Sequence, residues 1–412
     1  MEAITKVIQG YRKMEKPVLY AIAAQFCIQA VHTSAFLLLN FFMAKQGYAD
    51  YEIAQVLSWR YMAVFFLAFP VGLFIKGRRL LPFFYAAAIA MPVVTHLLLF
   101  AIDKHWDNWI PVLAMIWGLA YMAMQVTILP FILLNGKPET HSEAFSLSFL
   151  TFSATIFIVG VCNSLLHQLD PVFFTEKRIL QGVATLSILA VYFVYKIRVR
   201  ENLSARVPFH QIRRDYDWGL IVKAFIPSLI MAIGAGFTIP VINLFFLHVH
   251  GVNSALFSVM GAVTYGIVAI VMLFMPYIRR SFGYRIAITL FQSMAIIALF
   301  SLATTEYYRD LGFALPVAIF FYTLRQPLMN AAAPMTTELI MKYVGKRNRE
   351  IMSALQASIW AGSWFLSMKL FAALRALEFR YVTIFLITVG LYLVGVIWYA
   401  LIIRQYERNP ED

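Results

Sequence analysis

Long apolar runs alternate with short polar segments along the whole chain. A helix needs about 20 mostly apolar residues to cross a membrane. The pattern therefore predicts an all-α polytopic membrane protein with twelve transmembrane helices, at residues 17–44, 52–76, 80–101, 109–135, 142–167, 178–197, 219–248, 253–278, 284–303, 311–341, 349–376 and 380–404.

The longest polar interruption lies at residues 198–218, where five arginines accompany polar residues and a proline. Six of the predicted helices precede it and six follow it. We therefore expect an N-terminal six-helix bundle over residues 1–197, a cytoplasmic linker over 198–218 and a C-terminal six-helix bundle over 219–412.

Composition and charge support a membrane protein. Hydrophobic residues make up 61% of the chain and charged residues only 13%, whereas about 25% of the residues in a soluble protein are charged. The net charge of +13 comes from basic residues that cluster in alternate short loops, as cytoplasmic loops do. This placement indicates membrane topology rather than nucleic-acid binding, and it puts both termini in the cytoplasm. The first residues lack the apolar core and cleavage site of a secretory signal, so we expect the first helix to be permanent.

The two halves of the chain resemble one another at matching positions. Gly136-Lys137 follows the fourth predicted helix, and Gly345-Lys346 follows the tenth. Pro130 and Pro334 lie shortly before these pairs. Internal repeats with a binding site at their interface are typical of secondary transporters.

With six plus six helices, a basic linker and basic loops after helices two and eight, the chain resembles the major facilitator superfamily (MFS), in its bacterial twelve-helix form. Residues 234–243, Gly-Ala-Gly-Phe-Thr-Ile-Pro-Val-Ile-Asn, resemble the seventh helix of many members. The family's Gly-x-x-x-Asp loop motif is altered, because Gly72 is present but Lys76 stands at the acidic position. The resemblance implies two pseudo-symmetric bundles, a monomer in a bacterial inner (plasma) membrane, and a central cavity lined by helices one, four, seven and ten.

Polar residues fall on one face of several of these helices, because they are spaced at three to four residues. We expect these faces to line the cavity and bind substrate. The residues are Gln25, Gln29 and His32 on helix one, Trp117, Tyr121 and Gln125 on helix four, Thr238 and Asn243 on helix seven, and Tyr322, Gln326 and Asn330 on helix ten. The alternative for each amide is a hydrogen bond between neighbouring helices, and for each aromatic ring it is packing.

Arg325 lies about halfway along the tenth predicted helix. A charge at that depth costs about 2.5 kcal/mol or more and by default marks a functional site. Because a guanidinium is permanently charged and forked, we expect Arg325 to bind an anionic substrate group; pairing with a carbonyl or carboxylate of a neighbouring helix is the alternative. Arg60 on the second helix is a further candidate for substrate binding, with snorkelling to the outer surface as its alternative.

Carboxylates are scarce inside the predicted helices. Nearly all lie in loops or at helix ends, and helices one and four contain none in their interiors. Glu338, near the inner end of helix ten, is the candidate intramembrane acid. It either carries a coupling proton or closes a cytoplasmic gate by pairing with an arginine.

The sequence offers little support for an enzyme or a metal site. It contains no P-loop or Walker motif, which argues against an ATP-driven pump. His248 and His250 lack nearby acids that would complete a metal site. Cys27 and Cys162 lie in apolar segments, where packing is their expected role. We expect no cofactor, no bound metal and no nucleic-acid partner.

These features together predict a secondary active transporter that works by alternating access in a lipid bilayer. Its expected partners are a small organic solute, anionic if Arg325 binds it, and a coupling proton or ion. The alternative within the same superfamily is a multidrug efflux pump for amphipathic compounds, which would rely on the aromatic residues and Glu338.

Overall fold

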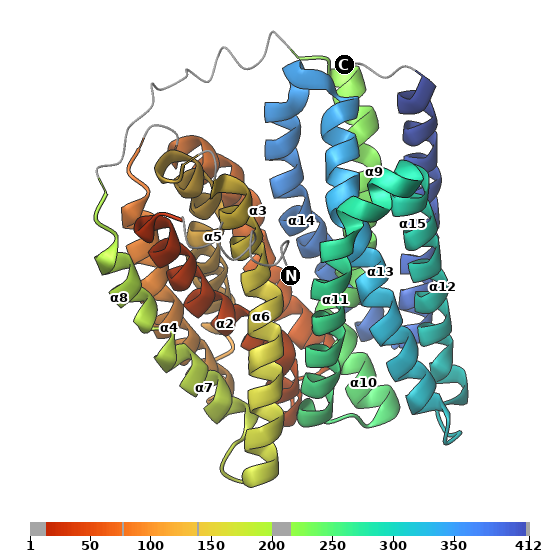
Figure 1. Cartoon of the computed structure of the whole chain (residues 1–412). Coiled ribbons are helices and arrows are strands. Elements are labelled where there is room, and N and C mark those ends of the chain that lie inside the picture. The colour runs from red at the N-terminus through yellow and green to blue at the C-terminus, as the bar shows by residue number, and fades with distance from the viewer. Residues whose placement is uncertain (1–13, 76–77, 138–139, 200–215, 409–412) are drawn as a thin grey trace, which may run out of the picture.

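The computed structural model describes residues 14–75, 78–137, 140–199 and 216–408. Helical segments occupy all twelve predicted places (Figure 1). The first six segments are α2 (Lys16–Lys45), α3 (Asp50–Ile75), α4 (Leu81–Asp103), α5 (Ile110–Asn135), α6 (His141–Leu169), and α7 (Glu176–Leu186) with α8 (Leu189–Lys196). The last six are α9 (Trp218–Thr238) with η3 (Ile239–Val241) and α10 (Ile242–His250), α11 (Ser254–Tyr284), η4 (Arg285–Leu290) with α12 (Phe291–Thr304) and η5 (Thr305–Tyr308), α13 (Ala314–Tyr343), α14 (Gly345–Ala376) and α15 (Tyr381–Arg408).

The seventh predicted helix is interrupted at Pro240. The α-helix α9 ends at Thr238, and the 3-10 turn η3 leads into α10, because proline has no N–H for the helical hydrogen-bond ladder. Gly234 and Gly236, in contrast, lie within α9. A Cβ atom at Gly236 would stand 2.6 Å from the Cβ of Ser367, so this glycine allows close packing of α9 on α14 rather than a bend.

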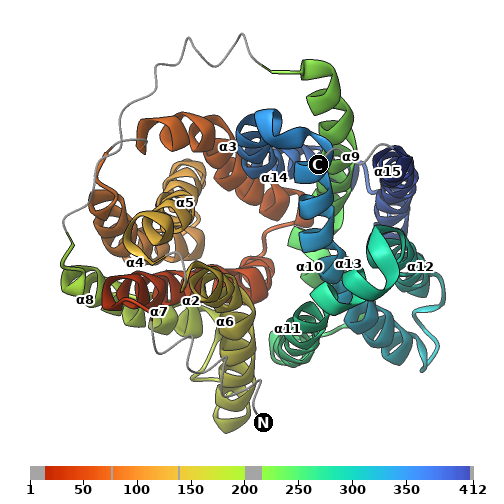
Figure 2. The same ribbon diagram turned by 45° about the horizontal axis from the view of Figure 1, so that its top comes forward.

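The helices form two groups that stand side by side. Helices α2–α8 lie on one side and α9–α15 on the other (Figures 1 and 2). We call the end of the molecule at which α8 ends and α9 begins the linker end, and the opposite end the far end. Residues 200–215 of the predicted linker and Lys76 of the loop motif lie outside the described residues.

Two helix pairs, α3 with α14 and α6 with α11, make extensive contacts between the groups. Small residues allow the close approach that drives helix association in membranes. A Cβ atom at Gly160 of α6 would lie 2.6 Å from the carbonyl oxygen of Ser258 of α11. Gly362 of α14 gives similar room to the ring of Phe65 of α3.

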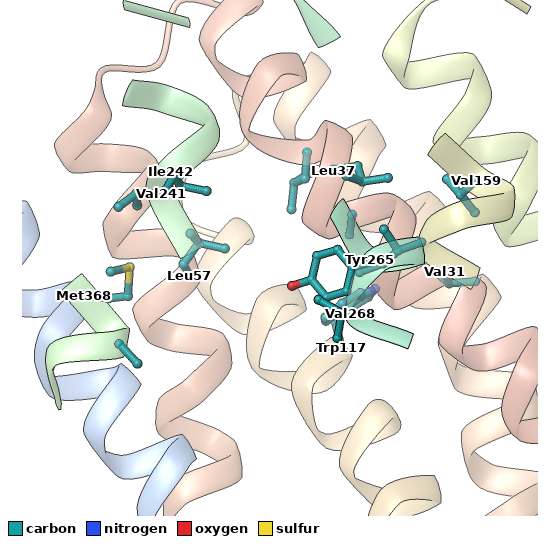
Figure 3. Close-up of a cluster of buried hydrophobic side chains, with 14 of the residues drawn as sticks. Val31, Leu37, Leu57, Trp117, Val159, Val241, Ile242, Tyr265, Val268 and Met368 are labelled. Carbon is teal, nitrogen blue, oxygen red and sulfur yellow. The ribbon is translucent and has the colours of Figure 1, made fainter. Parts of the chain in front are cut away.

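The buried core includes residues from both groups. Figure 3 shows Leu57 and Trp117 from the first group, and Tyr265 and Met368 from the second, within one cluster of buried side chains. Within the described residues, nine helices are long and apolar enough to cross a membrane. The chain is therefore an integral, multi-pass membrane protein.

Candidate functional site

A first cavity of about 200 Å³ lies within the group α2–α8. Gln25 and Gln29 of α2 line it together with Tyr121 and Gln125 of α5. Gln29 Oε1 accepts hydrogen bonds from Gln125 Nε2 at 2.7 Å and from the Tyr121 hydroxyl at 3.2 Å. The polar faces predicted for helices one and four, which are α2 and α5, therefore face each other across this cavity.

Helix α6 supplies a third wall of the first cavity. Ser148 donates a hydrogen bond of 2.8 Å to Gln25 Oε1, and Thr151 lies one turn further along the same lining. The Nε2 atom of Gln29 is buried and has no hydrogen-bond partner among the described residues. An unpaired buried donor is costly, so this cavity favours a solute that carries hydrogen-bond acceptors.

Arg60 is buried next to the first cavity, with 8% of the residue's surface exposed. Its Nη2 lies 2.6 Å from His32 Nδ1, and its guanidinium stacks 4.1 Å from the ring centre of Trp117. Because arginine can only donate, Nδ1 of His32 is the acceptor and the proton sits on Nε2. The His32 ring in turn stacks on Tyr121, with 4.0 Å between ring centres. Arg60 thus has partners inside the protein and does not snorkel.

A second cavity of about 210 Å³ lies within the group α9–α15. The predicted residues Gln326 and Asn330 of α13 line it. Gln292 of α12, Gln356 of α14 and Tyr392 of α15 add polar groups to its wall. The stripes on helices one and four therefore line one cavity and the stripe on helix ten another.

Arg325 stands directly behind the wall of the second cavity and is completely buried. It donates a hydrogen bond of 3.3 Å to Gln326 Oε1 and one of 3.2 Å to the Tyr392 hydroxyl. Its Nε has no partner among the described residues, and no described carboxylate pairs with it. Charge-assisted hydrogen bonds are ordinarily about 2.7–2.9 Å long, so this cation is held by weak, neutral contacts. The predicted residue Tyr322, one turn earlier on α13, is also fully buried.

Asn243 occupies the contact between the groups rather than either cavity. Asn40 of α2 donates hydrogen bonds of 2.8 Å to Asn243 Oδ1 and to the carbonyl oxygen of Pro240. The carbonyl next to the break in the seventh helix thus binds a protein side chain from the other group.

A cluster around Asp50 joins the groups at the far end. Asp50 Oδ2 accepts hydrogen bonds from Arg375 Nε at 3.1 Å and Nη2 at 2.9 Å, and a short one from the Tyr381 hydroxyl. His248 Nδ1 lies 3.0 Å from the other carboxylate oxygen. His248 therefore belongs to an ionic contact between the groups, whereas His250 is 3.0 Å from Thr305.

A second contact at the far end joins the first residue of α7 to the first residue of α11. Glu176 accepts hydrogen bonds from Lys45 and from Ser254, both at 2.6 Å. Asn163 of α6 donates to the Ser258 hydroxyl at 2.9 Å. In the described part of the chain, the polar contacts between the two groups thus lie toward the far end.

The remaining charged candidates lie apart from the cavities. Glu338 pairs with Lys342 on its own helix at 2.9 Å and is partly exposed. The Lys369 ammonium sits 4.3 Å from the ring centre of Trp59, a cation–π contact that joins α14 to α3.

Sequence reasoning missed Asp50, Asn40, Arg375 and Ser148. Asp50 and Arg375 stand at helix ends, where a charge carries no signal of its own. Ser148, Thr151 and Thr155 do recur on one face of α6, and that spacing would have identified the third wall of the first cavity.

The sequence itself matches no protein-family model and no curated protein. The fold, however, matches solved membrane transporters over nearly the full length of both chains. A POT family peptide transporter gives a TM-score of 0.75 at 12% identity and covers 95% of this chain and 97% of its own. A bacterial homologue of the human lysosomal transporter Spinster gives 0.72 at 12% identity, covering 95% and 97%. A D-xylose–proton symporter gives 0.71 at 12% identity, covering 92% and 96%. The chain has the fold of MFS-type transporters, as the resemblance in its sequence predicted.

Proposed function

We propose that this chain is a secondary active transporter that moves a small organic anion across the membrane by alternating access. The two groups of helices act as six-helix bundles that rock about the cavities described above. The transporter fold and its spread over nearly the whole chain support transport. The main support for an anionic substrate is Arg325, a buried cation held only by weak hydrogen bonds.

The contacts between the groups indicate which conformation this is. Asp50, Asn40 and Glu176 join the bundles near the far end, whereas Phe74, one residue before the end of α3 at the linker end, has an exposed side chain. The positive-inside rule puts the linker end in the cytoplasm. We infer an inward-facing state, the state named for the Spinster homologue.

The burial and the weak hydrogen bonds of Arg325 are the properties expected of an anion-binding site. A buried cation without a counter-charge is costly, and bonds of 3.2 and 3.3 Å to neutral groups offset little of that cost. A carboxylate or phosphate oxygen entering the second cavity meets Gln326 and Tyr392 first. The anion would replace these two weak bonds with short, charge-assisted hydrogen bonds from the Arg325 guanidinium, and this gain provides its affinity for the site.

The first cavity extends this recognition. Gln29 offers an unpaired donor there, and the Arg60 guanidinium lies behind Tyr121. Closure of the bundles around a solute would bring its acceptors against both walls. Such a solute is an organic acid with further hydrogen-bond acceptors, held by Arg325 at one end.

The test is a thermal-shift screen of the purified protein against organic anions and amphipathic drugs, repeated with Arg325→Gln. We expect a set of anions to stabilise the wild type and Arg325→Gln to weaken their binding about 10- to 100-fold, the worth of a hydrogen bond to a charged group. Lys369→Gln is the matched control, because it also removes a cation within a helix but lies against Trp59. If drugs alone stabilise the protein and Arg325→Gln binds them normally, the efflux alternative replaces the anion transporter.

Coupling is tested at Glu338. Glu338 is partly exposed and forms its ion pair with Lys342 of the same helix, at i,i+4 spacing, and such pairs contribute only about 0.3–0.5 kcal/mol. Glu338→Gln should therefore leave substrate-driven proton flux in vesicles within about twofold of the wild type. Loss of proton flux with substrate binding retained would instead identify Glu338 as the proton carrier.

A further inference from the structure

An apolar groove of about 460 Å³ runs along the outer surface of the helices α2, α6 and α7, away from both cavities. Helix α2 contributes Phe26 and Ala30, and α6 contributes Val159 and Leu166. On α7 the lining continues to Leu186, whose side chain is 67% exposed. The groove thus opens toward the surroundings of the bundle, which in a membrane are lipid.

The length of the groove matches half a bilayer. Its lining on the sixth segment extends from Arg178 near the far end to Leu189 just past the break between α7 and α8. These eleven steps correspond to roughly 16 Å at the rise of an α-helix. One leaflet contributes about 15 Å of a hydrocarbon core that is about 30 Å thick. A single acyl chain would therefore fill the groove from end to end.

The polar side chains in the lining are Arg178 and Ser187. Ser187 lies at the inner end and bonds the carbonyl of Ala184, so it needs no ligand. Arg178 lies at the far-end mouth, donates one hydrogen bond to the carbonyl of Phe173 and stacks on its ring. No carboxylate of the described residues pairs with Arg178, whereas its neighbour Lys177 is bound to Asp103 at 2.9 Å.

We propose that this groove is a binding site for an anionic glycerophospholipid, with one acyl chain along α6 and α7 and its phosphate on Arg178. The apolar lining contacts the chain, and the free donors of the guanidinium bind the headgroup. Near a surface that contains anionic lipid, a basic side chain contributes about 1 kcal/mol of attraction, which corresponds to about a fivefold preference over a zwitterionic lipid when the two are offered to the protein separately. The site is independent of the transported solute.

The two cysteines of the chain, Cys27 and Cys162, both line this groove, and Cys162 is exposed. They provide a direct reporter of occupancy. In Cys27→Ala protein, purified as the full chain in detergent, Cys162 becomes the sole thiol. Its rate of modification by N-ethylmaleimide, followed by intact mass, is measured while phosphatidylglycerol or phosphatidylcholine with identical acyl chains is added.

Phosphatidylglycerol should slow the modification of Cys162 at about a fivefold lower concentration than phosphatidylcholine does. Arg178→Gln should abolish that preference, whereas Lys177→Gln, which removes an adjacent cation already paired with Asp103, should keep it. Native mass spectra of the same variants should show one tightly retained phosphatidylglycerol that is lost with Arg178→Gln. Equal protection by the two lipids in the parent protein, or a preference that survives Arg178→Gln, would overturn the proposal.

Discussion

Arg375 donates two hydrogen bonds to Oδ2 of Asp50, from Nε at 3.1 Å and from Nη2 at 2.9 Å, and so joins the last turn of α14 to the first residue of α3. Tyr381 donates a third to the same oxygen. The residues come from opposite groups of helices, so this cluster has to separate whenever the far end opens.

Asp50→Asn should therefore shift the protein toward opening at the far end. Losing the charge of one hydrogen-bonded pair costs about 1.5–3 kcal/mol, which corresponds to a change of about tenfold or more in the ratio of the two states. A cysteine placed at the buried Ala262 of α11, in protein without its native cysteines, should react correspondingly faster with a membrane-impermeant maleimide.

The control for that experiment is Glu52→Gln on the same helix. Glu52 accepts a hydrogen bond from the backbone of Ala49 and makes no described contact with the other group. The Glu52→Gln variant should therefore leave the rate of cysteine labelling unchanged. Equal acceleration by both variants would mean that general loosening of α3, rather than the Asp50–Arg375 contact, exposes the site.

Tyr392→Phe tests whether the phenol holds Arg325 in place of a substrate. The variant removes one of the two weak hydrogen bonds to the guanidinium, so the substrate-free protein should lose about 0.5–1.5 kcal/mol of stability, the worth of an ordinary hydrogen bond. The rise in Tm caused by a bound anion should be larger than in the wild type, because the anion restores the lost contact. Tyr399→Phe removes a hydroxyl from the same cavity that bonds Ser228 instead, and its anion response should stay normal.

Gly160→Ala tests the close approach of α6 and α11. The added methyl group would stand 2.6 Å from the carbonyl oxygen of Ser258, and overpacking of this kind costs about 1–3 kcal/mol. The Tm of the purified protein should fall. Gly390→Ala on α15 meets no atom within 4 Å and should be neutral or slightly stabilising, because alanine favours helix by about 1 kcal/mol over glycine.

Glu15, which precedes α2, should make stability depend on acid. Burial raises the pKa of its carboxyl, but backbone hydrogen bonds at Glu15 and Lys137, the Thr140 hydroxyl and the charge of Lys137 outweigh this and hold the pKa below its usual value of 4.5. A lowered folded-state pKa contributes stability above about pH 4.5 that is lost as the pH falls through the folded value. As the pH is lowered from 5, the Tm of the wild type should therefore fall more steeply than the Tm of Glu15→Gln. Parallel curves would contradict this assignment.

Hydropathy and helical spacing were enough to predict all twelve helical segments and the facing amide stripes of α2 and α5, because both are local properties of the chain. The contacts between Asn40 and Asn243 or Asp50 and Arg375 join residues about 200 and 325 positions apart. Only the packing of the two groups brings them together, and no pattern near either residue signals its partner.

The roles of the two glycines in the seventh helix could also not be predicted from the local sequence. Gly234 and Gly236 each lie where a neighbouring side chain, Tyr392 or Ser367, leaves no room for a Cβ atom, so close packing rather than a bend accounts for both glycines. The helix axis is interrupted at Pro240 alone of these three, where the chemistry of the residue itself decides the outcome.

The concentration of contacts at the far end has a consequence for selectivity. In the proposed alternating-access cycle, a solute that enters from the linker end must release more free energy on binding in the closing bundles than the Asp50, Asn40 and Glu176 contacts lose on parting. Compounds that merely fit the cavities would then occupy the protein without being carried, and would act as inhibitors. Weakening the far-end contacts should turn some of those inhibitors into substrates, widening the range of cargo without a single change in the binding residues.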